Sequence, residues 1–365
     1  MNASAKGNLS QKTTRIDWLI AILTGLFAFI VYSLTLTPSL SFLSPDGSEL
    51  ATIPALLGLA HMPGYPLYTW LGFLFSKIPI GDVAHRINML SAFMGAVGVA
   101  GLYLAAIQIL PKRFAWDTTP ADETMVAQPL SEVLNRGCAA LGASLFAFSI
   151  TFWSQALIAE VYAVNLGMIA LTLLALLHWE RTQRARDFSL FALLFGLSLG
   201  THISNLGFAP AFIIFILLTS LSILKNWRWW LGALSGFGLG VLQYAWLPLK
   251  AYSLNDSIML RNAPTSLDGI YKYTLGAFPQ MKFAFPVSLL PDRLVLYIFM
   301  LQQEYGWLAM LLGIFGLFSM LFRRPRHFYL FVGMYLVHVW FFIQYRVFDL
   351  EVFFIPSHFL WAIFL

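Results

Sequence analysis

Long apolar runs recur along this chain, separated by short polar connectors. A helix of about 20 apolar residues crosses the hydrocarbon core of a bilayer, so the pattern predicts an all-α, polytopic transmembrane protein. The first run, 18–36, is longer than the core of a typical signal peptide, and we interpret it as a retained span. The remaining predicted spans, which bring the total to about ten, lie near 86–110, 137–153, 162–179, 188–204, 206–224, 229–249, 294–322, 328–345 and 352–365.

Composition excludes several other classes of protein. Hydrophobic residues make up 59% of the chain and charged residues 11%, against about 25% charged in a soluble domain. The net charge of +5 is spread over short clusters and forms no basic face, which argues against nucleic-acid binding. Cys138 is the single cysteine, so neither an intramolecular disulfide nor a thiolate metal cluster can form. The sequence has no Gly-rich phosphate loop, His-Glu-x-x-His or Asp-x-Asp motif for soluble nucleotide chemistry.

Basic connectors predict the orientation of the spans. If residues 1–16 form a cytoplasmic tail, the connectors at 112–113, 181–186, 225–228 and 323–326 all fall on the cytoplasmic side. The outer side then receives two large loops, 38–85 and 250–293, and two short segments, 154–161 and 346–351. We expect residues 17–365 to form one transmembrane domain. The final run is still apolar where the sequence stops, which indicates a fragment of a longer protein.

The first outer loop brings two acids into one short stretch. Ser44 and Pro45 predict the start of a helix that extends to about Ala60. Asp46 would lie in its first turn, where the helix dipole favours an ionised carboxylate, and Glu49 would share the same face. A turn at 61–66 precedes a second expected helix, to about residue 78, and both helices suit the membrane surface. A helix cap with no chemistry is the alternative interpretation of the two acids.

Several sequence blocks resemble a known membrane family. Pro45-Asp-Gly-Ser-Glu-Leu50, Leu57-Gly-Leu-Ala-His-Met-Pro-Gly-Tyr-Pro-Leu67 and Arg86-Ile-Asn-Met-Leu-Ser-Ala92 resemble the signature of the family catalogued as domain of unknown function 2723 (DUF2723). That family is similar to the protein O-mannosyltransferases and belongs with the GT-C type of polytopic glycosyltransferase. Blocks at 152–162, 196–202 and 348–356 support the resemblance, which covers nearly all of the chain after about residue 30. Met62 departs from the family's usual His-Pro-Pro pattern, although Pro63-Gly64 still permits a turn.

The resemblance implies a transferase that moves a sugar, such as a mannose-like hexose, from a polyprenyl-phosphate donor to an acceptor hydroxyl on the outer face. The acceptor would be a protein or a glycan. The family's acidic catalytic residue maps onto Asp46, which would act as the general base with Glu49 as its neighbour. No acid is required for the leaving group, because that group is already a phosphate. The residues expected to bind substrate are His61, Arg86, Glu160, His202, Asp349 and Glu351.

A cation is needed near the leaving phosphate, and Arg86 at the outer interface is the first candidate because guanidinium binds phosphate in a bidentate way. His202, Arg261 and Arg346 are further candidates. The alternative for Arg86 is ordinary interfacial snorkelling. The alternative for His202 is an interfacial histidine that is satisfied by its neighbours.

The remaining acids also have two interpretations. Glu160 stands in a short outer turn close to hydrocarbon, where a carboxylate is costly without a partner, so it serves a site or a structural ion pair. Asp349 and Glu351 share a face only on an extended segment, and a local ion pair with Arg346 is their alternative.

Cofactor, function class and location complete the predictions. No cofactor is expected with any certainty, since two acids alone, Asp46 and Glu49, make a weak site for a divalent metal. A transporter or lipid flippase is the main rival, but it predicts charges at the membrane midplane and an internal repeat, neither of which is evident. A non-catalytic scaffold is a third hypothesis for the function. Absent cysteine pairs favour a bacterial plasma membrane over the endoplasmic reticulum.

Overall fold

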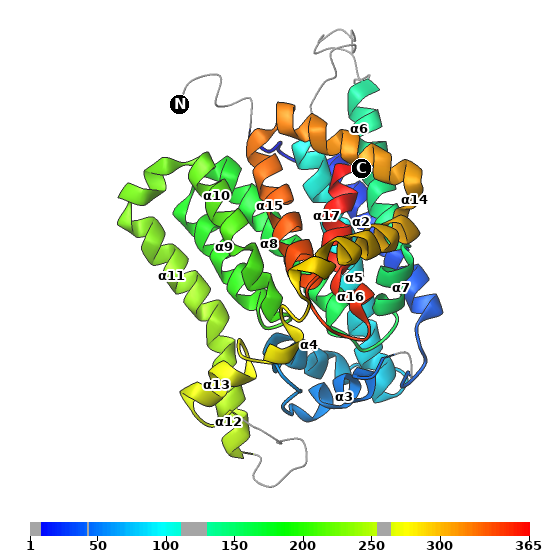
Figure 1. Cartoon of the computed structure of the whole chain (residues 1–365), viewed down its shortest axis with the longest axis vertical. Coiled ribbons are helices and arrows are strands. Elements are labelled where there is room, and N and C mark those ends of the chain that lie inside the picture. The colour runs from blue at the N-terminus through cyan, green and yellow to red at the C-terminus, as the bar shows by residue number, and fades with distance from the viewer. Residues whose placement is uncertain (1–8, 42–43, 111–129, 254–263) are drawn as a thin grey trace.

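The computed structural model describes residues 9–41, 44–110, 130–253 and 264–365, and these residues contain helices and no strands (Figure 1). The expected all-α fold is therefore confirmed. In chain order, with η marking a 3-10 helix, the elements are α2 (Arg15–Thr35), α3 (Gly47–Thr52), η1 (Pro54–Leu56), α4 (Pro66–Ser76), α5 (Val83–Ile109), α6 (Leu130–Ala147), α7 (Ile150–Ala156), α8 (Val161–Thr182), α9 (Ala185–Ser198), η2 (Ile203–Phe208), α10 (Ala209–Thr219), η3 (Leu221–Lys225), α11 (Trp227–Val241), η4 (Leu242–Ala245), α12 (Trp246–Ser253), α13 (Leu267–Tyr273), η6 (Pro279–Met281), η7 (Val287–Leu289), α14 (Leu290–Arg323), α15 (Pro325–Phe342), α16 (Leu350–Phe353) and α17 (Ile355–Phe364).

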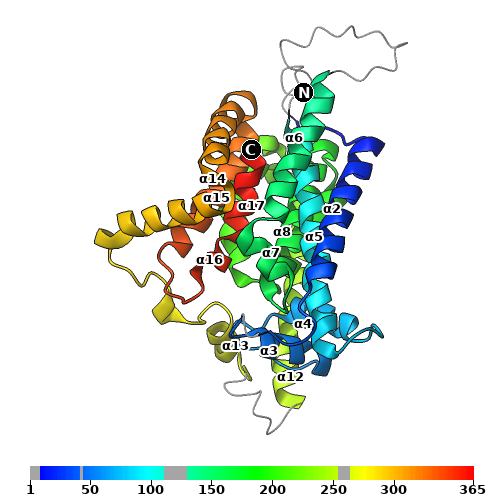
Figure 2. The ribbon, with the colours of Figure 1, turned by 90° about the vertical axis from the view of Figure 1, so that its right-hand side faces the viewer.

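Two long apolar helices form the centre of the bundle. Helices α5 and α8 pack against each other, and 78% of the most apolar stretch of each is buried. Helix α2 covers α5 on one side, while α9 and then α11 continue the layer beyond α8. Helix α14, broken at Gly306 where the backbone has φ 72°, lies on the rim with α15 and α17 beside it. Figure 2 shows α14 and α15 on the side of the bundle away from α2.

Fewer than ten helices of the described residues meet the length and apolarity of a membrane span. Within the described residues, α2, α5, α8 and the segment 287–323 are long and apolar enough to cross a bilayer. Helices α6 and α7 would make a fifth span if counted together, although they meet at an angle of 69°. The prediction of ten spans is not confirmed. Helices α9, α10, α11 and α17 coincide with predicted spans but contain only 14, 11, 15 and 10 residues, fewer than the roughly 20 that a span needs.

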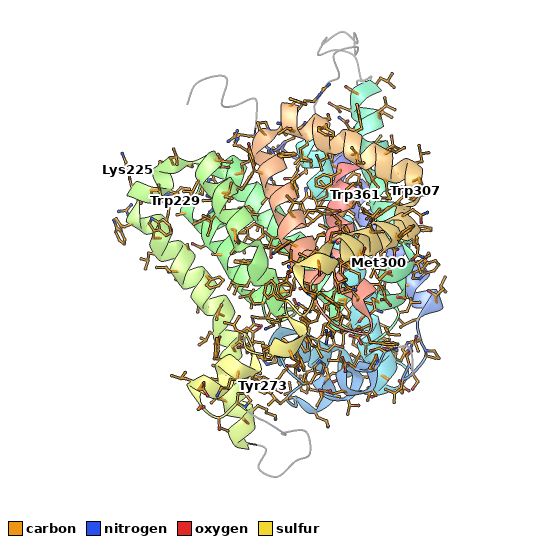
Figure 3. The ribbon with its side chains drawn as sticks, viewed as in Figure 1. Lys225, Trp229, Tyr273, Met300, Trp307 and Trp361 are labelled. Atoms are coloured by element: carbon orange, nitrogen blue, oxygen red, sulfur yellow. The ribbon has the colours of Figure 1, made fainter. Side chains whose placement is uncertain are left out.

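Basic connectors gather at one end of the bundle, as the charge pattern predicts. Arg181 Nη1 donates to the backbone oxygen of Gln11 at 3.1 Å, and Arg324 Nη1 donates to that of Leu9 at 2.9 Å. The ends of α8 and α14 therefore meet the N-terminal segment, and Figure 3 places Lys225 at the same end. Helices α3, α4 and α13 lie at the opposite end (Figures 1 and 2). The predicted connector at 112–113 lies outside the described residues.

The first outer loop folds differently from the prediction. Helix α3 ends at Thr52 and does not continue to Ala60, because Pro54 lacks a backbone N–H and begins the 3-10 turn η1. Leu57 then adopts a left-handed conformation with φ 46°, which ends the helical path. The second helix of the loop agrees with the sequence, since α4 begins at Pro66.

Helices α9 and α11 approach closely along a stripe of glycines. Gly232, Gly236 and Gly240 repeat every four residues on α11 and face α9. A Cβ atom on Gly240 would lie 2.6 Å from the backbone oxygen of Leu193, closer than real Cβ contacts. Small residues at this spacing allow helix backbones to touch where lipid gives no hydrophobic driving force.

We expect Gly240→Ala to push α11 away from α9 and to lower the free energy of unfolding by about 1–3 kcal/mol. Gly238→Ala is the matched control, because a Cβ atom there meets nothing within 4 Å. Thermal unfolding of both variants in detergent measures the difference. Equal melting temperatures for the two variants would contradict the close helix contact.

Candidate functional site

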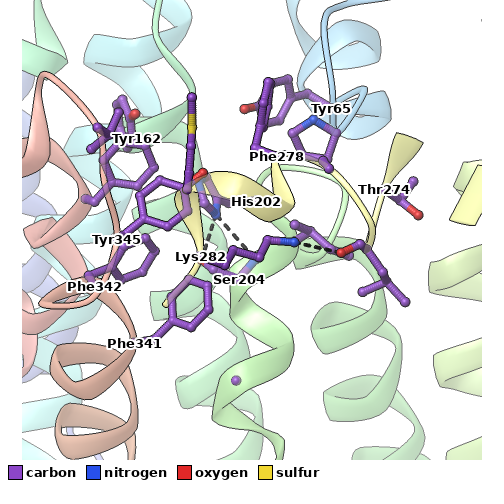
Figure 4. Close-up of a pocket in the computed structure, with 18 of the residues that line it drawn as sticks. Tyr65, Tyr162, His202, Ser204, Thr274, Phe278, Lys282, Phe341, Phe342 and Tyr345 are labelled. Carbon is purple, nitrogen blue, oxygen red and sulfur yellow. Dashed lines mark hydrogen bonds between the residues drawn. The ribbon is translucent and has the colours of Figure 1, made fainter. Parts of the chain in front are cut away.

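A cavity of about 590 Å³ opens at the end of the bundle opposite the basic connectors (Figure 4). Its size lies within the range of roughly 300–1,000 Å³ that is common for small-molecule sites. We call it the outer cavity, because the predicted outer loops 38–85 and 250–293 contribute to its wall. Its wall comes from the loop that carries α3, from η2, from the loop after α13, from α15 and from the segment 345–353. The charged and histidine side chains that line it are Asp46, Glu49, His61, His202, Lys282, His338 and Asp349.

His61 bridges two carboxylates at one side of the cavity. Its Nδ1 lies 3.2 Å from Glu49 Oε2, and its Nε2 lies 3.7 Å from Asp46 Oδ2. The backbone N–H of His61 also donates to Glu49 Oε1 at 2.6 Å. Burial by itself would lower the pKa of His61, but the Glu49 hydrogen bond and the charges of Asp46 and Glu49 raise it overall. The imidazolium form is therefore more stable here than in a free histidine.

Two local backbone features bring these three residues together. Asp46 precedes the first residue of α3, and Glu49 follows in its first turn. The chain then reverses at Gly64, where φ is 98° and a Cβ atom would lie 2.8 Å from Leu247. This reversal returns His61 to the start of α3. Tyr65 follows the reversal and has an unfavourable backbone φ of 38°. The centre of its ring lies 5.3 Å from that of the His61 ring.

Glu160 is linked through Ser44 to the turn that contains Asp46. It is 4% exposed, caps the start of α8 and hydrogen-bonds to Ser44 Oγ. Ser44 Oγ in turn accepts from the backbone N–H groups of Asp46 and Gly47 at 3.1 and 3.0 Å. Burial, with the nearby charge of Asp46, raises the pKa of Glu160 to about 7. Glu160 does not line the cavity, so the structure gives it a positioning contact in place of the expected substrate contact.

His202 does line the cavity, but not as a cation. Burial lowers its pKa to about 4, so the ring is neutral at physiological pH. Its Nδ1 faces Ser204 Oγ at 2.6 Å (Figure 4). A neutral imidazole supplies no charge for a phosphate, which removes His202 from the set of phosphate-binding cations that the sequence suggested.

Arg86, the first choice for the phosphate, points elsewhere. Its guanidinium donates to the backbone oxygens of Ser76, Ile80 and Gly81 at 2.8–2.9 Å. These hydrogen bonds hold the turn that follows α4. Arg86 does not line the outer cavity. Arg346 is also occupied outside the cavity, with its guanidinium over the ring of Phe285. Arg261 lies outside the described residues.

The structure separates the other two predicted acids. Asp349 lines the cavity, and burial together with the charges of Glu351 and Asp46 raises its pKa. Glu351 is exposed on α16 and does not line the cavity. Neither acid forms an ion pair with Arg346 among the described residues.

Lys282 is a cavity residue that the sequence reasoning missed. Its Nζ donates to the backbone oxygen of Leu275 at 2.7 Å, and no carboxylate of the described residues pairs with it. It is the only Lys or Arg among the described residues that line the cavity. Burial lowers the pKa of this ammonium group. The available signal was its place in the aromatic-rich loop 250–293, between Met281 and Phe283.

A metal ion would find three potential ligands here. Ligand atoms of Asp46, Glu49 and His61 lie within 4.8 Å of one another, the one such group of three in the described part of the chain. However, both ring nitrogens of His61 already face carboxylates. Three protein ligands are also fewer than the six or more oxygens that Ca²⁺ or Mg²⁺ takes. The positions of Asp46, His61 and Glu49 therefore favour a chain of two ion pairs, with His61 in the middle, over a metal site.

Sequence comparisons find that part of this chain is similar to one group of known proteins. Residues 46–224 match a sequence model of the family described as the N-terminal domain of protein O-mannosyl-transferase TMEM260. Mouse protein O-mannosyl-transferase TMEM260 is 28% identical over 64% of this chain and 31% of its own length. The Dictyostelium discoideum protein of the same name is 31% identical over 39% of this chain and 15% of its own length. No solved structure matches.

The spans and the outer cavity define a multi-pass helical membrane protein. Residues 46–224, just under half of the chain, are similar to this O-mannosyltransferase-like family of membrane proteins, as the sequence blocks predict. The matched region begins at Asp46 and includes Glu49, His61, Glu160 and His202. The aligned regions span less than a third of either relative.

The raised pKa of Glu160 has a consequence for stability. Its folded-state pKa of about 7 exceeds the ordinary value of 4.5, so the folded protein binds this proton more tightly than the unfolded chain. Stability of the wild type should therefore fall, relative to Glu160→Gln, as pH rises from about 4.5 to about 7, and the gap should stay constant above that. Chemical unfolding across this range measures the gap. Asp292→Asn at the exposed start of α14 is the control, and parallel curves for wild type and Glu160→Gln would contradict the assignment.

Proposed function

We propose that this protein is a membrane glycosyltransferase that moves a sugar, a mannose-like hexose, from a polyprenyl-phosphate donor to an acceptor hydroxyl at the outer cavity. The observation that carries the proposal is the placement of Asp46, a half-exposed carboxylate that His61 contacts at the edge of the outer cavity. A cation, Lys282, lies on another wall of the same cavity. The relatives' names support the reaction class. A protein hydroxyl is the acceptor that those names favour, with a glycan as the second candidate.

Asp46 is the base in this proposal. Its side chain is 55% exposed and therefore accessible to an acceptor, whereas Glu49 is bound to both the ring and the backbone of His61. The acceptor hydroxyl would give its proton to Asp46 as its oxygen bonds to the anomeric carbon. The bond from that carbon to the phosphate oxygen breaks, and the polyprenyl phosphate leaves with the electron pair. His61 keeps Asp46 oriented and balances its charge.

Lys282 is the partner for the leaving phosphate. Negative charge grows on the phosphate as the glycosidic bond breaks, and a cation in a partly desolvated site stabilises that charge. Nζ uses one of its three protons on Leu275 and keeps two for a ligand. Lys282 thus takes the role that the sequence assigned first to Arg86.

A transporter or flippase remains the rival, and the placement of charges does not favour it. Transport sites lie near the membrane midplane. Here the cavity acids collect at one end, while Glu180 pairs with His327 and Asp17 with Arg136 at the other. We place the transfer on the outer face of the membrane. A bacterial plasma membrane stays a prediction, and both relatives are eukaryotic.

Asp46→Asn should lower the rate of sugar transfer by about 100- to 10,000-fold while donor binding is retained, because the amide keeps the shape but accepts no proton. Transfer of radiolabelled mannose from polyprenyl-phosphate-mannose to serine- and threonine-containing peptides, in nanodiscs, measures the effect. Asp268→Asn is the matched control, since Asp268 pairs with Lys272 in the outer loop and does not line the cavity. Wild-type protein that binds the donor without any turnover would favour the flippase.

Lys282→Gln should weaken the binding of polyprenyl phosphate about tenfold to a hundredfold, the usual effect of losing a hydrogen bond to a charged group. Lys282→Arg should keep most of the affinity because it keeps the charge. Lys272→Gln is the control, as this exposed lysine is bound to Asp268 at 2.6 Å. If Lys272→Gln and Lys282→Gln lower the affinity equally, the cavity cation is not specific.

A further inference from the structure

One wall of the outer cavity carries a histidine whose tautomer the surrounding atoms fix. The backbone N–H of Ser204 points at His202 Nδ1 at 3.4 Å, and a backbone N–H can only donate. Nδ1 is therefore the acceptor, and the Ser204 hydroxyl, at 2.6 Å, donates to the same nitrogen. Nδ1 therefore carries no proton, and the proton of the imidazole ring sits on Nε2.

The N–H group on Nε2 has no hydrogen-bond partner among the described residues. His202 belongs to the cavity wall and is only partly buried (Figure 4). A neutral donor that is held in one orientation and left unused is costly unless water or a ligand accepts from it. The Nε2–H group of His202 can therefore donate one hydrogen bond, in a fixed direction and without charge, to a ligand in the cavity.

Aromatic rings surround this donor. The rings of Tyr65, Tyr162 and Phe353 lie 6.4, 6.2 and 5.9 Å from that of His202. The hydroxyl groups of Tyr65 and Tyr162 have no partner in the described residues either, and both tyrosines line the cavity. Flat apolar faces with a few neutral donors match a sugar ring, which has C–H faces and hydroxyl edges. They do not match a phosphate, which needs charge.

We propose that His202, held by Ser204 and framed by Tyr65 and Tyr162, hydrogen-bonds through Nε2–H to a hydroxyl of the donor sugar and helps to select that sugar. This inference rests on the proposed function, since it assigns the sugar subsite of the same cavity. It divides the cavity by chemistry: Lys282 recognises the phosphate, and the His202 wall recognises the hexose. His202 is a binding residue here and moves no proton.

The test compares two ligands on two variants. His202→Asn retains a polar atom near the position of Nδ1, toward Ser204, but lacks the donor at Nε2, whereas His202→Gln can place an amide N–H near Nε2. Binding to nanodisc-embedded full chain is measured for polyprenyl-phosphate-mannose and for the same polyprenyl phosphate without sugar. His202→Asn should bind the mannosyl lipid about tenfold to a hundredfold more weakly and bare polyprenyl phosphate as the wild type does. His202→Gln should recover much of the loss.

Monodeoxy donors sharpen the assignment to a hydroxyl group. The wild type should lose affinity for the one deoxymannosyl lipid that lacks the bonded hydroxyl, and His202→Asn should bind that analogue no more weakly than the wild type does. Equal losses for the mannosyl lipid and the bare phosphate would overturn the inference, because His202 would then serve the phosphate or the fold. No loss for either ligand would also overturn it.

Binding separates this inference from the proposed reaction. If wild-type protein prefers the mannosyl lipid through His202 but transfers no sugar, the proposed transferase function fails and the sugar subsite stands. If wild-type protein binds the mannosyl lipid no better than bare polyprenyl phosphate, the subsite fails even where transfer is observed. The unchanged binding of bare polyprenyl phosphate also shows that His202→Asn is folded.

Discussion

The ion-pair chain from Asp46 through His61 to Glu49 is the interaction on which the outer cavity depends. One imidazole ring holds two carboxylates that like-charge repulsion would otherwise separate. The chain requires the short helix α3 and the reversal at Gly64, which together return residue 61 to residue 46. Glu160 and Ser44 fasten this loop to the start of α8, one of the two central helices. These contacts join the surface loop directly to the bundle.

The two ends of the molecule use charge in different ways. At the end with the basic connectors, buried acids have fixed partners: Glu180 lies 3.0 Å from His327, and Asp17 lies 2.8 Å from Arg136. Such pairs hold segments together and leave little room for a ligand. At the outer end, Asp46 remains half exposed, Lys282 lacks a carboxylate partner among the described residues, and His202 keeps an unused N–H. Unused polar groups around one cavity distinguish a binding site from a structural network.

The sequence predicted the general architecture better than the details of the site. Apolar runs and basic connectors predict a helical membrane protein with the acids of its outer loops at one end, because both patterns follow directly from the bilayer. The family blocks identify Asp46, Glu49 and His61, which the structure brings together. The length of α3 was wrong because Pro54 and the left-handed Leu57 override a favourable start signal. The number of spans is not confirmed, since apolar stretches such as α10 are broken into short helices.

The cation of the cavity could not be predicted from the sequence alone. Arg86 has the right chemistry and depth, but three nearby carbonyl groups occupy its guanidinium. Lys282 is distant from the family blocks, and only tertiary folding brings its loop beside η2 and α15. A structure of the Asp46→Asn protein with bound polyprenyl-phosphate-mannose, determined by electron microscopy, tests the account most directly. We expect the phosphate beside Lys282 and the hexose between residue 46 and His202. A donor bound between the spans, away from the outer cavity, would contradict the account.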